Sequence, residues 1–168
     1  MINDANKSAL YKKYLSIFDA HHQDPEFFTL RQSNAELSTV MGGRPWSWHV
    51  IGITNAALIR YKELNFKHVS KSGITRAHIQ PRFITTKILI SGDRPFEIDG
   101  FFDLWLKSDK TIICGAGENT KEFKSKYIPI ENDDYHLFAS STIGWKFSTK
   151  REGQYLRRLC ENTVISRP

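Results

Sequence analysis

Hydrophobic positions near the N-terminus recur at the spacing of a helix. The apolar stripe over residues 4–20 consists of Leu10, Tyr14, Ile17 and Phe18. Asn3 or Asp4 can cap a helix that begins there, and the segment "HHQDP" ends it. Farther along, Ser33 and Glu36 have the spacing of a capping box and Gly42 supplies a stop. The pattern therefore predicts two helices in the first 42 residues.

The next segments alternate between strand and helix patterns. "HVIGI" at 49–53 predicts a short buried strand, and Thr54 can cap a third helix that ends near Leu64. Residues 73–90 are rich in β-branched side chains and predict one strand or two, with Pro81 at an edge or bulge.

Residues 96–106 fit two patterns, and the sequence does not choose between them. As a strand, this segment would place Glu97, Asp99 and Asp103 on one face; as a helix, it would form an apolar face that includes Phe101 and Trp105. After it, residues 108–114 predict a turn into a strand, and 118–127 predict a short helix.

The last third of the chain predicts strand-like pieces and a final helix. The strand-like pieces lie at 128–138 and 142–148. Thr149 and Glu152 have capping-box spacing, with Tyr155, Leu156 and Leu159 expected to pack inward. The cations expected to point outward from this helix are Lys150, Arg151, Arg157 and Arg158.

These elements together predict an α+β fold, with central, mainly antiparallel strands and helices at the N- and C-termini. We expect a single domain over residues 1–168. Its parts would be a helical region at 1–45, a mixed strand and helix core at 46–147, and a C-terminal helix at 148–163.

Composition fits an ordinary globular protein. Of the 168 residues 40% are hydrophobic and 25% charged, which is enough for a core. No apolar run approaches the roughly 20 residues of a membrane span, and the N-terminus lacks the apolar region of a signal peptide. Cys114 and Cys160 are the only cysteines in the sequence, so we do not expect a disulfide framework. We expect a cytoplasmic location.

The net charge is +6, and the charged residues are unevenly distributed along the chain. Residues 60–94 carry eight Lys and Arg against two acidic residues, and residues 144–168 carry six against two. The stretch between them, 97–136, has nine Asp and Glu against five Lys. Such a pattern suits a protein that holds a phosphate backbone and presents carboxylates to a metal. It also suits an ordinary solvated surface.

Two segments, "RAHIQPR" at 76–82 and "DKTIICGAGENTK" at 109–121, carry a family resemblance. Together they resemble the HNH, or ββα-metal, nuclease motif, in which a histidine on one strand faces a second strand that runs into a helix. The resemblance implies that His78 is the general base that deprotonates water, because imidazole titrates near neutral pH. It assigns catalytic roles to His78, Asn119 and Lys121.

The same resemblance implies one Mg²⁺ or Mn²⁺ ion. Glu118 and Asn119 would hold it through oxygen atoms. Ala77 stands where the family usually places a metal-binding residue, so Asp99 or Asp103 would supply that ligand.

A second resemblance, over residues 96–121, is to the PD-(D/E)xK nuclease core. It makes Asp99 and Glu118 the metal-binding carboxylates and Lys121 the lysine, although the last two are one residue farther apart than the usual triplet. Glu122-Phe123-Lys124 has the usual spacing. This pattern requires residues 96–106 to form a strand.

A third, partial resemblance is to the second half of the GIY-YIG nuclease motif. Gly52 and Arg60 are eight residues apart, as in that family, and Val50 stands where the family has a tyrosine. A strand followed by a capped helix predicts the same residues. Arg60 can contact phosphate under either interpretation.

Aromatic and basic side chains supply candidates for nucleic-acid binding. The tryptophans could stack on unpaired bases or belong to the core: Trp46, Trp48, Trp105 and Trp145. The cations expected to contact phosphate are Arg60, Arg76, Arg82, Lys150 and Arg151, together with Lys121 in the catalytic motif.

The sequence thus predicts a restriction-type DNA endonuclease, cytoplasmic and homodimeric, that hydrolyses phosphodiesters with a divalent metal and a histidine base. RNA is the alternative substrate. A non-catalytic nucleic-acid-binding module is the alternative function, and a protein–protein adaptor is a third class.

Overall fold

The computed structural model describes residues 2–44, 46–67, 71–119, 126–133, 137–138 and 150–163. The chain divides into two compact units that are each discontinuous in sequence. Unit 1 comprises Met1–Ser47 and Gln80–Asp109, and unit 2 comprises Trp48–Ile79 and Lys110–Pro168. The elements form an α+β fold with helices toward both ends of the chain, as the sequence predicted.

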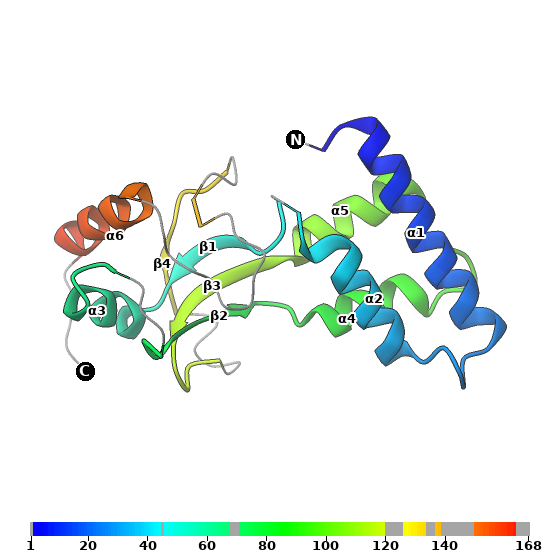
Figure 1. Ribbon diagram of the computed structural model, residues 1–168, viewed down its shortest axis with the longest axis horizontal. Coiled ribbons are helices and arrows are strands. Elements are labelled where there is room, and N and C mark those ends of the chain that lie inside the picture. The colour runs from blue at the N-terminus through cyan, green and yellow to red at the C-terminus, as the bar shows by residue number, and fades with distance from the viewer. Residues whose placement is uncertain are drawn as a thin grey trace. The chain divides into compact units, whose positions relative to one another are not determined.

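Unit 1 is helical (Figure 1). Its elements are α1 (Asp4–Gln23), α2 (Leu30–Gly42), α4 (Arg82–Ile90) and α5 (Ile98–Ser108). They share one apolar core in which Tyr14 stacks on Phe101, with ring centroids 4.4 Å apart, and Trp105 and Met41 are fully buried.

The two N-terminal helices begin with local caps. Asn3 accepts a hydrogen bond from the backbone N–H of Asn6 (2.8 Å), and α1 continues through the histidine pair to Gln23. The expected capping box at Ser33 and Glu36 is wrong, because α2 begins earlier, with Thr29 and Gln32 as the reciprocal pair. The Ser33 hydroxyl is buried and donates to the Thr29 carbonyl instead (3.3 Å).

The expected strand over residues 73–90 is correct only as far as His78. Beyond Pro81 the chain forms α4, although isoleucine and threonine favour strands. Four of its side chains recur at helical spacing and are buried against unit 1: Thr85, Thr86, Leu89 and Ile90. Residues 98–108 are helical as well, so the strand interpretation of 96–106 is wrong. In both segments burial of one helical face outweighs intrinsic propensity.

Unit 2 contains a four-stranded sheet with the order β2-β3-β1-β4. The strands are β1 (His49–Ile53), β2 (Ile74–His78), β3 (Lys110–Gly115) and β4 (Ile128–Pro129). β1 pairs with β3 in parallel, whereas β2 pairs with β3 and β4 with β1 in antiparallel fashion. Gly52 is needed in β1 because a Cβ there would collide with the Tyr127 ring.

Two helices complete unit 2, α3 (Asn55–Glu63) and α6 (Lys150–Asn162). Thr54 caps α3 as predicted, its hydroxyl accepting from the backbone N–H of Ala57 (3.3 Å). Leu156 and Cys160 of α6 lie in the same buried cluster as Leu58 of α3. The short helix expected at 118–127 and the strand expected at 142–148 fall mostly or wholly outside the described residues, as does Thr149. Within the described ranges, no helix has the length and apolar character needed to cross a membrane.

Candidate nucleic-acid interface

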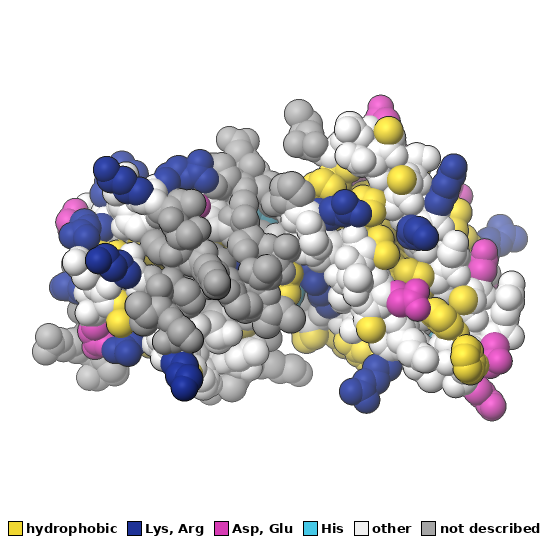
Figure 2. All heavy atoms as spheres, in the orientation of Figure 1, with side chains coloured by type: hydrophobic (Ala, Val, Ile, Leu, Met, Phe, Trp, Pro, Cys, Tyr) yellow, Lys and Arg dark blue, Asp and Glu magenta, His cyan; other side chains and the backbone are white. Residues whose placement is uncertain are grey.

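Helix α6 separates its cations from its buried side chains. Glu152, Leu156 and Cys160 are buried at four-residue intervals and so lie along one stripe. Arg151 and Arg158, seven residues apart, lie along another stripe and are exposed. We define the basic face as the exposed cations of α6 and α3: Lys150, Arg151, Arg157, Arg158, Arg60 and Lys62. Figure 2 shows Lys and Arg side chains gathered where Figure 1 draws these two helices.

Packing of α6 on α3 holds the basic face together. Arg157 donates from Nη2 to Asn65 Oδ1 (3.1 Å), just beyond the end of α3. Its guanidinium carbon also lies 5.0 Å from the centroid of the Phe66 ring, which is within range of a cation–π contact. Arg157 therefore joins α6 to the segment that follows α3, as well as adding charge.

Hydrogen bonds within the protein occupy part of the Arg60 guanidinium group. Its Nε donates to the Ser72 carbonyl (2.9 Å) and its Nη1 lies 2.7 Å from Glu63 Oε2. The side chain remains 44% exposed, so it contributes positive potential to the basic face even with a carboxylate beside it.

Lys150 and Arg151 lie in the first turn of α6. Arg151 is 58% exposed, and its Nη2 lies 3.5 Å from Oε1 of the buried Glu152. That same oxygen accepts from the backbone N–H of Phe138 (3.2 Å). The structure thus brings the predicted phosphate contacts Arg60, Lys150 and Arg151 onto two helices of one unit.

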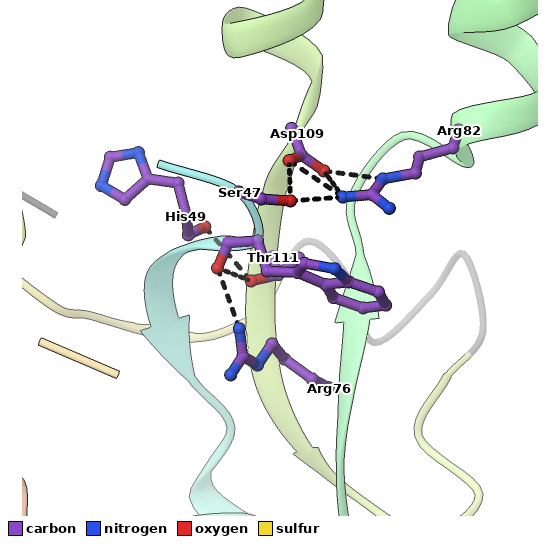
Figure 3. Close-up of polar contacts among 7 residues, drawn as sticks. Ser47, His49, Arg76, Arg82, Asp109 and Thr111 are labelled. Carbon is purple, nitrogen blue, oxygen red and sulfur yellow. Dashed lines mark hydrogen bonds and ion pairs between the residues drawn. The ribbon is translucent and has the colours of Figure 1, made fainter. Parts of the chain in front are cut away.

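Arg76 is directed into unit 2 rather than toward solvent. It donates from Nη1 to the Trp48 carbonyl (3.1 Å) and from Nη2 to the Phe138 carbonyl (3.3 Å). The Thr111 hydroxyl donates to the same Trp48 carbonyl (3.0 Å), as the dashed lines to Arg76 and Thr111 show in Figure 3. Trp48 has a φ of 60°, and these bonds help to hold its left-handed backbone.

Arg76 also affects a buried tyrosine of unit 2. Burial raises the pKa of the Tyr61 hydroxyl far above its usual value of 10, and the positive charge of Arg76 opposes part of that rise. The effect of Arg76 on this buried hydroxyl places its positive charge close to the interior of unit 2. A cation that binds phosphate would instead be expected at the surface.

His78 lies at the end of β2 and is partly exposed. Its ring centroid is 4.2 Å from that of Trp48, and it pairs with Thr111 in the β2–β3 ladder. Glu118 lies beyond the other end of the same ladder, where Ile74 pairs with Gly115. Four residues of a strand span about 13 Å, so the structure does not bring the predicted base and the predicted metal ligand together.

Glu118 has a structural role where it lies. Its Oε2 accepts from the Thr54 hydroxyl (2.5 Å) and from the backbone N–H of Gly115 (2.7 Å). The carboxylate therefore connects the start of α3 to the end of β3. Asn119, next to it, is exposed.

The predicted Mg²⁺ site does not fit the described residues. Asp99 is exposed on α5 of unit 1, 3.9 Å from Lys7, and Asp103 is exposed on the same helix. Among the residues that the structure describes, no group of three His, Cys, Asp or Glu side chains could hold a metal ion. Lys121 and the triplet at 122–124 lie outside those residues.

Arg82 forms a buried polar network in unit 1 (Figure 3). Its guanidinium bonds both carboxylate oxygens of Asp109, at 2.9 and 3.0 Å, and its Nη2 bonds Ser47 Oγ at 2.7 Å. The side chains of Arg82 and Asp109 are only 12% and 2% exposed. Asp109, 27 positions from Arg82, has no local signal that marks it as its partner, and sequence reasoning missed it.

The tryptophans have three different environments. Trp105 is buried in the core of unit 1, with its ring centroid 5.6 Å from the Arg82 guanidinium carbon. Trp48 contacts His78, Trp46 is partly buried, and Trp145 lies outside the described residues. Base stacking on Trp105 is therefore ruled out by burial.

No protein-family model, no curated protein and no solved structure matches this chain.

Proposed function

We propose that this chain binds nucleic acid, with duplex DNA as the preferred partner, through the basic face of unit 2. The observation that carries the proposal is the excess of exposed cations on α6, where four Lys and Arg side chains and one acid, Glu161, are exposed away from the buried stripe. Lys and Arg that neutralise phosphates supply most of the sequence-independent affinity of DNA-binding proteins.

The dimensions of α6 suit a phosphate backbone. A helix of 13 residues is about 20 Å long, and duplex DNA carries one negative charge per roughly 1.7 Å of its axis. Lys150 and Arg158, eight residues apart, are separated by about 12 Å along the helix axis. Such a helix can contact several phosphates at once.

Exposed cations elsewhere in unit 2 favour the same partner. Lys67, Lys71 and Lys126 are exposed, and within the described residues of this unit Lys and Arg outnumber Asp and Glu. Because of this excess of cations, the positive potential of the unit is only partly compensated.

Fluorescence anisotropy with a labelled duplex tests the proposal. Binding should weaken steeply as salt rises from 50 to 200 mM, by about 10-fold or more if several phosphates are contacted. Absence of binding at 50 mM salt, or binding that is independent of salt, would contradict it. A single strand and an RNA duplex of equal length show whether the partner is specifically duplex DNA.

DNA cleavage is a second proposed function, supported by the partial exposure of His78. An imidazole open to solvent at the end of a strand can accept a proton from water, whereas one enclosed in hydrocarbon cannot. The described residues provide no metal site beside it, so we derive no metal-dependent step. A restriction-type enzyme would also be expected to act as a homodimer, because a duplex has two strands.

Plasmid cleavage separates the two functions. The protein, with and without Mg²⁺ and with EDTA, is compared with His78→Ala and with His22→Ala, a histidine of unit 1. Loss of cleavage in His78→Ala alone would support the catalytic role of His78. Binding without cleavage in the wild-type protein would leave the chain a binding module.

A further inference from the structure

A pocket of about 240 Å³ lies between α1 and α2 in unit 1. Its lining consists of Asn6, Ala9, Leu10 and Lys13 from α1 with Val40, Arg44 and Trp46. The α1 residues recur at three- and four-residue intervals, so they form a continuous stripe on one helix face. The pocket belongs to unit 1 alone and shares no residue with the basic face.

The charges around this pocket all have one sign. Lys13 and Arg44 are exposed, and among the residues that the structure describes no acidic side chain lines the pocket. Neither cation forms an ion pair with a carboxylate of the described residues; Arg44 donates only to the Val40 carbonyl, at 3.3 Å. Two uncompensated cations at one pocket favour a ligand with two negative charges.

The remaining lining favours a flat apolar body. Leu10, Val40 and Trp46 are buried or partly buried and belong to or pack against the core of unit 1. Trp46 lines the pocket and is partly exposed, so its indole ring offers an aromatic surface to a ligand.

We infer that this pocket binds a nucleotide, with its phosphate at Lys13 and Arg44 and its base against Trp46. A phosphate monoester carries up to two negative charges at neutral pH, and a base has a flat face that can stack on an indole ring. The volume is below the roughly 300–1,000 Å³ of pockets for drug-sized ligands, so a bound nucleotide would extend beyond the pocket and a longer segment would not fit in it. The nucleotide can be free or the phosphorylated end of a strand.

Titration with dAMP, followed by calorimetry and by the indole ¹⁵N–¹H signals, tests this inference. The Trp46 signal, assigned with Trp46→Phe, should shift on addition of dAMP. Adenosine and inorganic phosphate should each bind at least 10-fold more weakly, because each retains only half of the contacts. Absence of dAMP binding at millimolar concentration, or equal binding of adenosine, would overturn the inference.

Charge variants locate the binding. Lys13→Gln and Arg44→Gln should each weaken dAMP binding about 10-fold, whereas Lys12→Gln, an exposed neighbour outside the pocket, should change it less than twofold. Equal effects of Lys12→Gln and Lys13→Gln would overturn the assignment. All variants are first checked for a wild-type circular dichroism spectrum and melting temperature.

Competition identifies the source of the nucleotide. A 5′-phosphorylated oligonucleotide that displaces dAMP, while its 5′-hydroxyl form does not, assigns the pocket to a strand end. Failure of both to compete assigns it to a free nucleotide, and each result supports the inference. The basic face lies in unit 2 and the pocket in unit 1, so the two proposals can fail separately. Substitutions in α6 should abolish duplex binding and leave dAMP binding unchanged.

Discussion

Arg82 and Asp109 form a bidentate ion pair inside unit 1, with N–O distances of 2.9 and 3.0 Å. The pair joins the first turn of α4 to the residue that follows α5, and Ser47 completes it through hydrogen bonds to both partners. An arginine that sequence alone assigns to phosphate is therefore a structural residue.

Asp109→Asn should destabilise the protein by about 3–5 kcal/mol, because it leaves the Arg82 guanidinium buried without its counter-charge. The free energy of unfolding in urea measures the effect. Asp103→Asn, an exposed substitution on α5, is the matched control and should change stability by less than about 0.5 kcal/mol. A similar loss in both variants would show that the buried pair has no special role.

Arg76→Lys should destabilise unit 2 by about 1–3 kcal/mol, since an ammonium group cannot replace the two-pronged contact with the Trp48 and Phe138 carbonyls. In Arg76→Gln, which removes the charge, the slope of log K against log salt for DNA binding should remain that of the wild type. A decrease of about 1 in that slope would instead indicate a phosphate contact. Arg158→Lys, on the surface of α6, serves as the control for stability.

Glu118→Ala should cost about 1–3 kcal/mol, because the Thr54 hydroxyl and the Gly115 N–H each lose their acceptor. Mg²⁺ should leave the melting temperature of the wild type and of this variant unchanged. Stabilisation of the wild type by Mg²⁺ that is absent in Glu118→Ala would restore the metal-ligand interpretation. Glu161→Ala, an exposed change on α6, is the control.

Stability should fall as the pH rises from about 10 to 12, and Tyr14 should account for part of the fall. Burial raises the pKa of Tyr14 to about 12, against 10 in an unfolded chain. The neutral phenol is thus favoured by folding, and its contribution, complete below pH 10, is lost as the pH approaches the folded value. Its hydroxyl donates to the Leu89 carbonyl (2.9 Å).

Urea unfolding at several alkaline pH values measures this effect. Tyr14→Phe should be less stable than the wild type at pH 8, because it loses the bond to Leu89, and should show a shallower decline above pH 10. An unchanged alkaline slope in Tyr14→Phe would assign the decline to other groups.

Much of the fold could be predicted where the signals are local. The strand at 49–53 followed by a Thr54-capped helix, the N-terminal stripe of α1 and the amphipathic pattern of α6 each depend on residues within two or three turns of one another. Residues 82–90 could not be predicted in this way. Their β-branched composition favours a strand, and only burial of one helical face against other parts of unit 1 selects a helix.

In the candidate site, too, features that depend on local spacing could be predicted, and features that depend on distant partners could not. Exposure of Lys150 and Arg151 could be predicted, because it follows from helical spacing within α6. The internal roles of Arg76, Arg82 and Glu118 depend on partners 3 to 64 positions away and on strand register. A motif gives the order of residues along the chain, whereas the β2–β3 pairing decides that His78 and Glu118 lie at opposite ends of the ladder.

The salt dependence of duplex binding in two charge-matched variants tests the central claim most directly. One variant removes three cations of the basic face, Lys150→Gln, Arg151→Gln and Arg158→Gln; the other removes three exposed cations of unit 1, Lys12→Gln, Lys87→Gln and Lys107→Gln. The slope of log K against log salt should decrease by about 2–3 in the first variant and remain at the wild-type value in the second. Equal slopes in the two variants would contradict the assignment of DNA binding to the basic face.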